Sequence, residues 1–206
     1  MHYFSGVKRM YRNGIEYDKL DKLIYSIYVD YNIKAFPIDE KDLCRKMKIA
    51  LVPYSAFSDE AKKLLQKKSN HAFFVKESKE NPPTIYYNDT FESEGSIRLS
   101  VFHEIGHYIC EDEDDSKDDL ADYFARHFMC PTAYLMLKGI ESPNEIVAFC
   151  GVSFQAACNA SANIANRKKK LGNKLLSYEK EFIKNIDPIA FWFYELTDRG
   201  EKVMNV

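Results

Sequence analysis

The feature that most constrains this chain is the stretch SVFHEIGHYICED, residues 100–112, in which His103 and His107 lie four residues apart. The apolar residues around them follow helical spacing, which predicts a buried helix. Residues four apart in a helix lie one turn above each other, so both imidazoles can reach one ion. Two neutral imidazoles at that distance are good zinc ligands. The stretch therefore predicts a zinc-binding helix.

A carboxylate and a glycine in the same stretch add to this prediction. Glu104 projects about 100° away from His103, close to the ion but not among its ligands. From there it can take a proton from an attacking water, as a general base does. Gly106 costs about 1 kcal/mol inside a helix, which indicates the close approach of another element. We expect Glu104 to be the catalytic residue; the alternative is two ordinary histidines in a core or on a solvated face.

Zinc also needs a third protein ligand and an open position for water. On the helix predicted over residues 118–129, Asp118 shares a face with small and apolar residues and with one further carboxylate, Asp122. A carboxylate on a buried face is costly unless a cation meets it, so Asp118 is the predicted third ligand. Asp122 is expected to accept a hydrogen bond from the outer nitrogen of a ligand histidine. Two alternatives stay open: Asp118 as a helix cap, and Asp119 as the ligand.

Composition excludes several classes of protein. A chain of 206 residues is long enough for one sizeable core and a smaller appendage. Its net charge of −2 gives no reason to expect general affinity for nucleic acid or acidic membranes. No apolar run approaches the roughly 20 residues that span a bilayer, and the first 14 residues do not resemble a signal peptide. The five cysteines lack paired spacing, which is typical of reduced thiols. We expect a cytoplasmic protein.

The order of predicted elements indicates an α+β fold. Helical periodicity and β-branched or aromatic runs predict the following elements in turn: a helix over 17–32, a helix begun by Pro37, a short strand over Ala50 to Pro53, strands over 71–76 and 84–88, a helix from Ser93, a helix over 118–129 ended near Pro131, and a helical region to 206. Helices that precede and follow a group of short strands are typical of an α+β core with a helical C-terminal region.

The segment IRLSVFHEIGHYIC, followed by DDLADYFARHFMCP, resembles the ImmA/IrrE family of metallopeptidases. The family's pattern of an acid, then Ala-Asn or Ala-Asp, then Phe-Ala and a proline falls here on Asp118, Ala121–Asp122, Phe124–Ala125 and Pro131. The resemblance spans roughly residues 36 to 135. It implies a minimal gluzincin-like domain over 1–136, with an active-site helix, a ligand helix and a small antiparallel sheet. A helical region over 137–206 follows.

One departure from the family concerns the third ligand, which is usually glutamate. The resemblance places Asp118 there, so we expect the shorter side chain to be offset by a closer ligand helix. With His103, His107 and Asp118 as zinc ligands and Glu104 as base, the resemblance implies a zinc endopeptidase. Its substrate would be a regulatory protein, a DNA-binding repressor of a mobile element or stress locus, with no membrane involved.

Two alternative functions stay open. The first is a metal-bearing regulator that binds its protein partner without cutting it; an intact Glu104 favours cleavage instead. The second is a DNA-binding protein, because residues 145–170 resemble a helix-turn-helix around Cys150 to Ser153. The net charge and the single short basic run argue against direct nucleic-acid binding. Packing against the core or docking of a substrate is the favoured interpretation of this hairpin.

Two further segments bear on substrate binding. Seven acids fall between Glu111 and Asp119, without the regular spacing of a calcium loop, so a solvated loop is predicted. The strand near TIYYN, residues 84–88, offers an edge that could bind an extended peptide by strand addition. A buried strand agrees equally well with that sequence.

Overall fold

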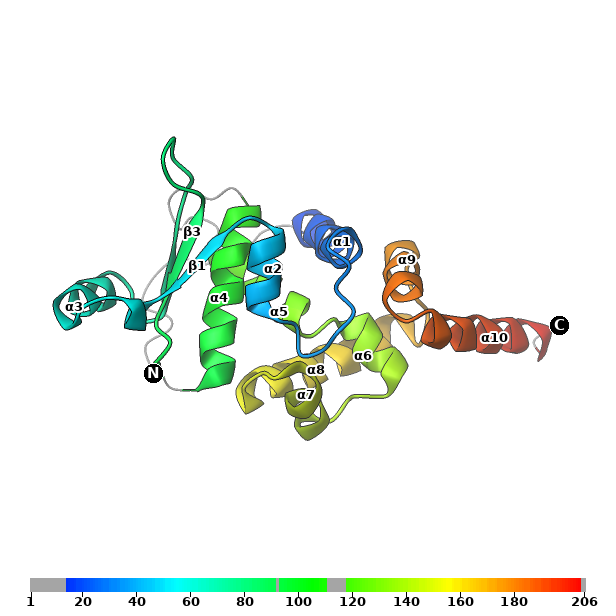
Figure 1. Cartoon of the computed structure of the whole chain (residues 1–206). Coiled ribbons are helices and arrows are strands. Elements are labelled where there is room, and N and C mark those ends of the chain that lie inside the picture. Colours follow the sequence, from blue (N-terminus) through cyan, green and yellow to red (C-terminus); the bar gives the residue numbers. More distant parts are fainter. Residues whose placement is uncertain (1–13, 92, 111–117, 205–206) are drawn as a thin grey trace.

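A computed structural model describes residues 14–91, 93–110 and 118–204. Within these residues the elements, in chain order, are α1 (Gly14–Asp30), α2 (Glu40–Lys46), β1 (Ala50–Pro53), the 3-10 helix η1 (Tyr54–Ala56), α3 (Asp59–Lys68), β2 (Ala72–Val75), β3 (Thr84–Tyr87), α4 (Glu94–Ile109), α5 (Asp118–Met129), α6 (Thr132–Lys138), α7 (Pro143–Cys150), α8 (Phe154–Leu171), α9 (Ser177–Ile186) and α10 (Pro188–Met204). The predicted acidic loop at 111–117 and the first 13 residues lie outside the described part. The sheet and α3 lie at one end of the molecule and α10 at the other (Figure 1), which agrees with an α+β class.

The sheet is mixed, so the prediction of an antiparallel sheet was wrong. Its strand order is β1-β3-β2; β2 pairs with β3 antiparallel, whereas β1 pairs with β3 parallel. Residues 54–83, which include α3 and β2, connect β1 to β3 and are long enough for the crossover that a parallel pair requires. Because β3 is the central strand, the interpretation of residues 84–88 as a buried strand is correct, and the alternative of a peptide-binding edge there is wrong. Both edges of β3 are already paired.

Local signals explain where the helices start. Pro37 does not begin α2 as predicted. Instead Asp39 is the N-cap, and its side chain accepts hydrogen bonds from the backbone N–H groups of Lys41 and Asp42. Ser93 caps α4 in the same way, accepting from the N–H of Ser96 at 3.3 Å. The start of the predicted zinc-binding helix is therefore fixed by its own sequence.

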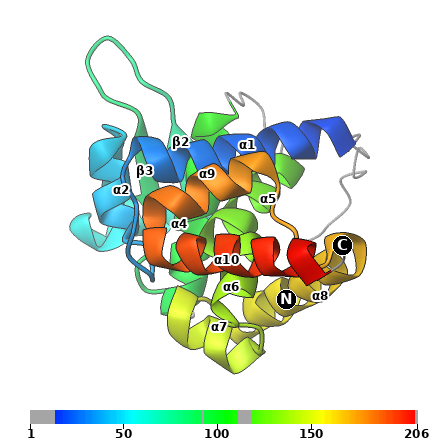
Figure 2. The same cartoon turned by 90° about the vertical axis from the view of Figure 1, so that its right-hand side faces the viewer.

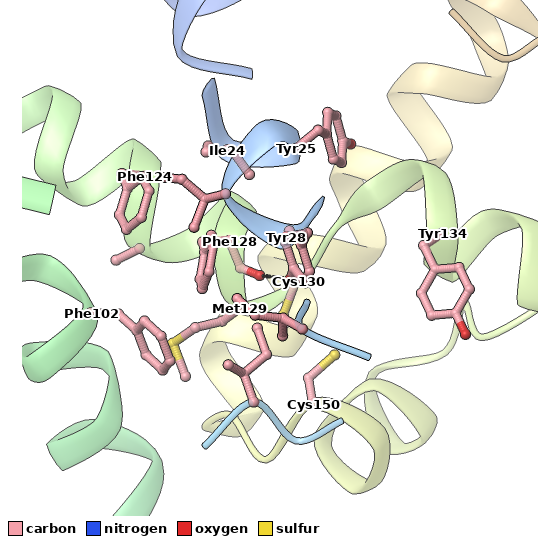
Figure 3. Packing of buried hydrophobic residues seen from close by; sticks show 14 of the residues in the cluster. Ile24, Tyr25, Tyr28, Phe102, Phe124, Phe128, Met129, Cys130, Tyr134 and Cys150 are labelled. Atoms are coloured by element: carbon pink, nitrogen blue, oxygen red, sulfur yellow. Dashed lines mark hydrogen bonds between the residues drawn. The ribbon is translucent and has the colours of Figure 1, made fainter. Parts of the chain in front are cut away.

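An aromatic core holds α4 and α5 against the N-terminal helix. Phe102 of α4 and Phe128 of α5 have ring centroids 5.6 Å apart, and Phe124 stacks on Phe128 at 5.0 Å. Tyr28 of α1 packs on Phe128, and its hydroxyl donates to the Phe128 carbonyl (Figure 3). These side chains are almost completely buried. The two helices that carry the predicted ligands therefore rest on a densely packed support.

The C-terminal helices share this core. Figure 2 shows α1, α9 and α10 lying beside one another, and the ring centroids of Tyr25 and Phe182 are 4.6 Å apart. One buried hydrophobic cluster contains residues from both sides of the boundary predicted at 136/137. Among the described helices, none has both the length and the apolar composition needed to cross a membrane.

The hairpin of α7 and α8 is docked on α4 through a buried arginine. Arg98 donates to the carbonyl oxygens of Gly151 at 2.6 Å and Ile38 at 2.5 Å, and it pairs with Glu40 at 3.1 Å. A Cβ at Gly95 would lie 2.7 Å from the backbone nitrogen of Ser153, so the turn packs directly on the first turn of α4. The hairpin is therefore attached to the helix that carries His103 and His107.

Candidate metal centre

Two histidines of α4 point at the same place. The Nε2 atoms of His103 and His107 are 3.0 Å apart, and their ring centroids are separated by 4.7 Å. The spacing of four residues places the rings one helical turn apart. Two imidazole nitrogens at this distance repel unless one donates a proton to the other or a cation lies between them. The pair therefore forms two adjacent donors of a potential metal site.

Asp118, the first residue of α5, completes a group of three. Its Oδ1 atom lies 3.2 Å from His107 Nε2 and 3.8 Å from His103 Nε2. A tetrahedral zinc ion with ligands at about 2.1 Å holds neighbouring ligand atoms about 3.4 Å apart. The three observed separations lie on both sides of that value. The nitrogen and oxygen donors present here therefore fit a zinc ion in both chemistry and spacing.

The side chain of Asp118 is 58% exposed, so the argument that selected it from a buried helix face was wrong. Ala121, Ala125 and Met129 do form a buried face, but the first turn of α5 extends beyond the core. The exposure leaves the group of three open to solvent on one side. A catalytic zinc site needs such an opening, because water or substrate takes the fourth position.

A second carboxylate of α5 orients the first histidine. Asp122 Oδ1 lies 2.9 Å from His103 Nδ1, and its Oδ2 accepts a bond of 2.8 Å from Arg126. An ionised carboxylate can only accept, so His103 must donate from Nδ1 and present the lone pair of Nε2 to the site. The hydrogen bond expected from a histidine to Asp122 is therefore present, and Arg126 donates to the other carboxylate oxygen.

Gly106 allows α4 and α5 to approach closely, as the sequence predicted. A Cβ at this position would lie 2.8 Å from the Cα of Ala121 and 3.1 Å from its carbonyl oxygen. Real Cβ atoms essentially never come within 3.0 Å of such atoms, so any larger residue would push the helices apart. The close contact brings the start of α5 within reach of both histidines.

The local charge strongly favours a cation. Burial lowers the pKa of His103, but the carboxylates of Asp118 and Asp122 outweigh it and raise the pKa to about 10. The negative charge of Glu104 acts in the same direction. The carboxylates that stabilise an imidazolium here would equally stabilise a metal ion in contact with the ring.

Residues 54–161 match the model of the Peptidase_M78 family, described as the IrrE N-terminal-like domain. The match covers just over half of the 206 residues and includes all of α4 and α5. The chain belongs to this family of metallopeptidases. No match was found among curated proteins or among solved structures. The family match extends beyond the resemblance seen in the sequence at its C-terminal end, through α6 and α7 into α8.

In this member of the IrrE N-terminal-like family, the contact at Gly106 bears on the length of the third ligand. The resemblance predicted that Asp118 stands where relatives carry a longer glutamate, and that a closer helix would offset the difference. The helices do touch at Gly106 and Ala121, one turn from Asp118. The contact places the short side chain of Asp118 near both histidines, and the expected offset relative to a glutamate stays a prediction.

Asp119, the alternative ligand, lies outside the group of three. Its Oδ2 atom is 3.5 Å from the hydroxyl of Tyr17 on α1. Among the described residues, the candidate metal-binding group consists of His103, His107 and Asp118. The direction of the Asp119 side chain therefore favours a link between α5 and α1.

Two residues near the site were not found from the sequence of this IrrE N-terminal-like domain. Tyr54 follows β1 and is buried; burial, together with the nearby charge of Glu104, raises the pKa of its hydroxyl to about 12. That hydroxyl donates to the carbonyl of Ser69 at 3.0 Å. Arg126 contacts the site through Asp122. Tyr54 has no spacing signal, because only the fold brings it near Glu104. Arg126 does have one, since it lies at i, i+4 from Asp122 on the same helix.

Proposed function

We propose that this member of the IrrE N-terminal-like family is a zinc-dependent endopeptidase, with His103, His107 and Asp118 as ligands and Glu104 as general base. The observation that carries the proposal is the convergence of three ligand atoms, 3.0 to 3.8 Å apart, near Glu104, whose negative charge acts on His103. Glu104 is buried on α4, next to His103 in the sequence. A site that only stored a metal would not need this carboxylate.

Each side chain has a distinct task in this proposal. Zinc, when bound by these three residues, supplies a Lewis acid that polarises a scissile carbonyl and makes water more acidic. Glu104 accepts the proton of the attacking water and passes it to the leaving amine. Asp122 keeps His103 in the tautomer that presents Nε2 to the site. The exposed side of Asp118 is where an extended peptide can enter.

The proposed substrate is a regulatory protein, namely a DNA-binding repressor of a mobile element or stress locus, cut in the cytoplasm. This part of the proposal rests on the resemblance to the ImmA/IrrE family. Of the alternatives, a non-cleaving regulator is disfavoured by the intact Glu104. A DNA-binding helix-turn-helix is disfavoured because Arg98 and Gly95 attach the α7–α8 turn to α4.

The metal assignment can be tested by the zinc content of the purified protein. We expect about one zinc per chain in the wild type and none after both His103→Ala and His107→Ala are introduced. His127→Gln is a matched control, because this histidine lies on α5 and stacks on Tyr123, 3.9 Å between ring centroids, outside the group of three. Stoichiometric zinc in the double variant would disprove the assignment.

The substrate can be sought by co-expression with the DNA-binding regulators encoded beside this gene. Cleavage products should appear with the wild type and disappear with the zinc-free double variant. If the zinc-loaded wild type binds one of these regulators tightly and leaves it intact, the non-cleaving alternative is correct.

A further inference from the structure

The helix α10 carries an apolar stripe that is largely exposed in the described part of the chain. The stripe consists of Ile189, Trp192, Phe193 and Leu196, whose side chains are 72%, 57%, 58% and 47% exposed. At 100° per residue, these four positions lie within an arc of about 100° on one side of the helix. Figure 2 shows α10 lying along the surface beside α9. Four large apolar side chains on one helical face are typical of an interface.

The opposite face of α10 is the one that attaches the helix to the protein. Tyr194 is buried, and its hydroxyl accepts a bond from the backbone N–H of Leu175 at 3.2 Å. The Nζ atom of Lys180 on α9 lies 5.3 Å from the centroid of the Tyr194 ring. The stripe is therefore not needed to hold α10 in place, and its side chains are available to another surface.

A groove runs along the stripe, between α10 and α6. It has a volume of about 470 Å³ and is lined by Leu137, Lys138, Asp187, Ile189, Ala190, Phe193, Tyr194 and Thr197. The two charged residues in this lining pair with each other, Lys138 Nζ to Asp187 Oδ2 at 3.2 Å. Between positions 188 and 196 the sequence has one charged residue, Glu195, which pairs with Lys180 of α9 at 3.3 Å. The groove and the stripe therefore fit an uncharged, apolar occupant.

We propose that the occupant is a second copy of this chain, paired through α10 about a two-fold axis. The same patch holds a protruding stripe and, next to it, a groove that shares Ile189 and Phe193 with the stripe. A two-fold arrangement brings the same patch of both copies together, so the stripe of each can enter the groove of the other. The small net charge of −2 gives little repulsion between copies.

The exposed area of the stripe supplies part of what a dimer requires. Trp192 and Phe193, taken at about 150–250 Å² each and a little over half exposed, present roughly 230 Å² per copy. Ile189 and Leu196, taken at about 120 Å² each, add roughly 140 Å². The two stripes together offer roughly 740 Å², and the groove walls supply the rest of the about 1,200 Å² at which stable interfaces begin. A small interface of this kind predicts a weak dimer, with a dissociation constant on the order of micromolar.

Trp192 is the only tryptophan of the chain, so its fluorescence reports on this interface alone. The full-length wild type should be followed by tryptophan emission and by light scattering from about 0.1 to about 100 µM, which brackets a micromolar dissociation constant. We expect the mass to rise from monomer to dimer while the emission moves to shorter wavelength over the same concentration range.

Variants distinguish this dimer from other associations. Ile189→Glu with Leu196→Glu should stay monomeric with long-wavelength emission at every concentration, because two charges would be buried in each copy. Leu64→Glu should behave as the wild type, since Leu64 is 66% exposed on α3 at the opposite end of the molecule (Figure 1). A wild type that stays monomeric, or a dimer that survives the double substitution, would overturn the proposal.

Discussion

Substitution of Gly106 by alanine tests whether α4 and α5 must touch for the metal-binding side chains to meet. The added Cβ would lie 2.8 Å from the Cα of Ala121, whereas ordinary contact begins at 3.4 Å. The two helices must therefore separate locally by about 0.6 Å. The atoms in the way belong mainly to the backbone of Ala121, so rotation of a side chain cannot relieve the contact.

A shift of that size should be visible in zinc affinity. Zinc sites keep their ligand distances within about 0.2 Å of the preferred values, so the displacement of Asp118 would be about three times that tolerance. We expect Gly106→Ala to weaken zinc binding by at least about 10-fold, the lower end of what a lost supporting contact costs. For the metal-free protein, alanine gains about 1 kcal/mol in helical propensity and loses about 1–3 kcal/mol to overpacking. Its stability should therefore be unchanged or lower.

The assay is competition for zinc against a chelator, with thermal unfolding of the metal-free protein measured alongside. Ser100→Ala is the matched control, because it raises the helical propensity of α4 without adding an atom between the helices. Its zinc affinity should equal that of the wild type. If Gly106→Ala binds zinc as tightly as the wild type and unfolds at a higher temperature, helical propensity alone is acting and the contact with α5 is not required.

The remaining predictions concern single ionisable residues. Asp118→Ala should lower zinc affinity by at least about 10-fold; Asp122→Asn should cost less than Asp118→Ala, on the scale of about 10–100-fold for a group that orients a ligand. Asp119→Ala should change the affinity little, and loss of metal from the Asp119 variant alone would reverse the assignment. In the metal-free protein the raised pKa of His103 gives stability that is complete below pH 6.5 and is lost as the pH rises through about 10. The proton on the His103 imidazole competes with zinc, so the apparent affinity for zinc should increase steadily from pH 6 to 9. A flat profile would contradict this. Burial raises the pKa of Asp21 to about 6. The stability that protonated Asp21 gives to the folded protein is therefore complete below pH 3.8 and is lost as the pH rises through about 6. Asp21→Asn should then raise the melting temperature at pH 8 but not at pH 4; equal effects at both would refute it.

The arrangement of the two histidines could be predicted because a helix fixes it locally. Four residues make one turn, so His103 and His107 had to lie together once the segment was helical. The pairing of Asp122 with a histidine followed from helical spacing on the next helix. Gly106 predicted the contact between the two helices, because a glycine destabilises the interior of a helix and is expected there where another element comes close.

Other parts of the fold could not be predicted from local sequence, or were missed. A short strand such as β1 has the same composition whether its neighbour is parallel or antiparallel, so the direction depends on the long connection. The exposure of Asp118 depends on how far α5 extends past the core. By contrast, α3 had clear signals that were overlooked: Ser58 as cap, acids in its first turn and lysines in its last.

Side chains that hydrogen-bond to distant backbone groups could not be predicted from the sequence either. Arg98 binds carbonyl oxygens that lie more than fifty positions away in the sequence, and nothing in those peptide groups marks them as partners. Tyr54 lies fifty positions from Glu104 in the sequence, and only the fold brings the two side chains near each other. Sequence spacing describes one helix at a time, so contacts between distant elements require the fold.

The most direct test of the central claim is hydrolysis of a partner regulator by zinc-loaded Glu104→Gln. Glutamine keeps nearly the same shape but cannot accept the proton of an attacking water. The variant should hold one zinc per chain and bind the regulator as the wild type does, while hydrolysis falls by at least about 10²-fold. Undiminished cleavage at full zinc occupancy would contradict the assignment of Glu104 as the base of a zinc endopeptidase.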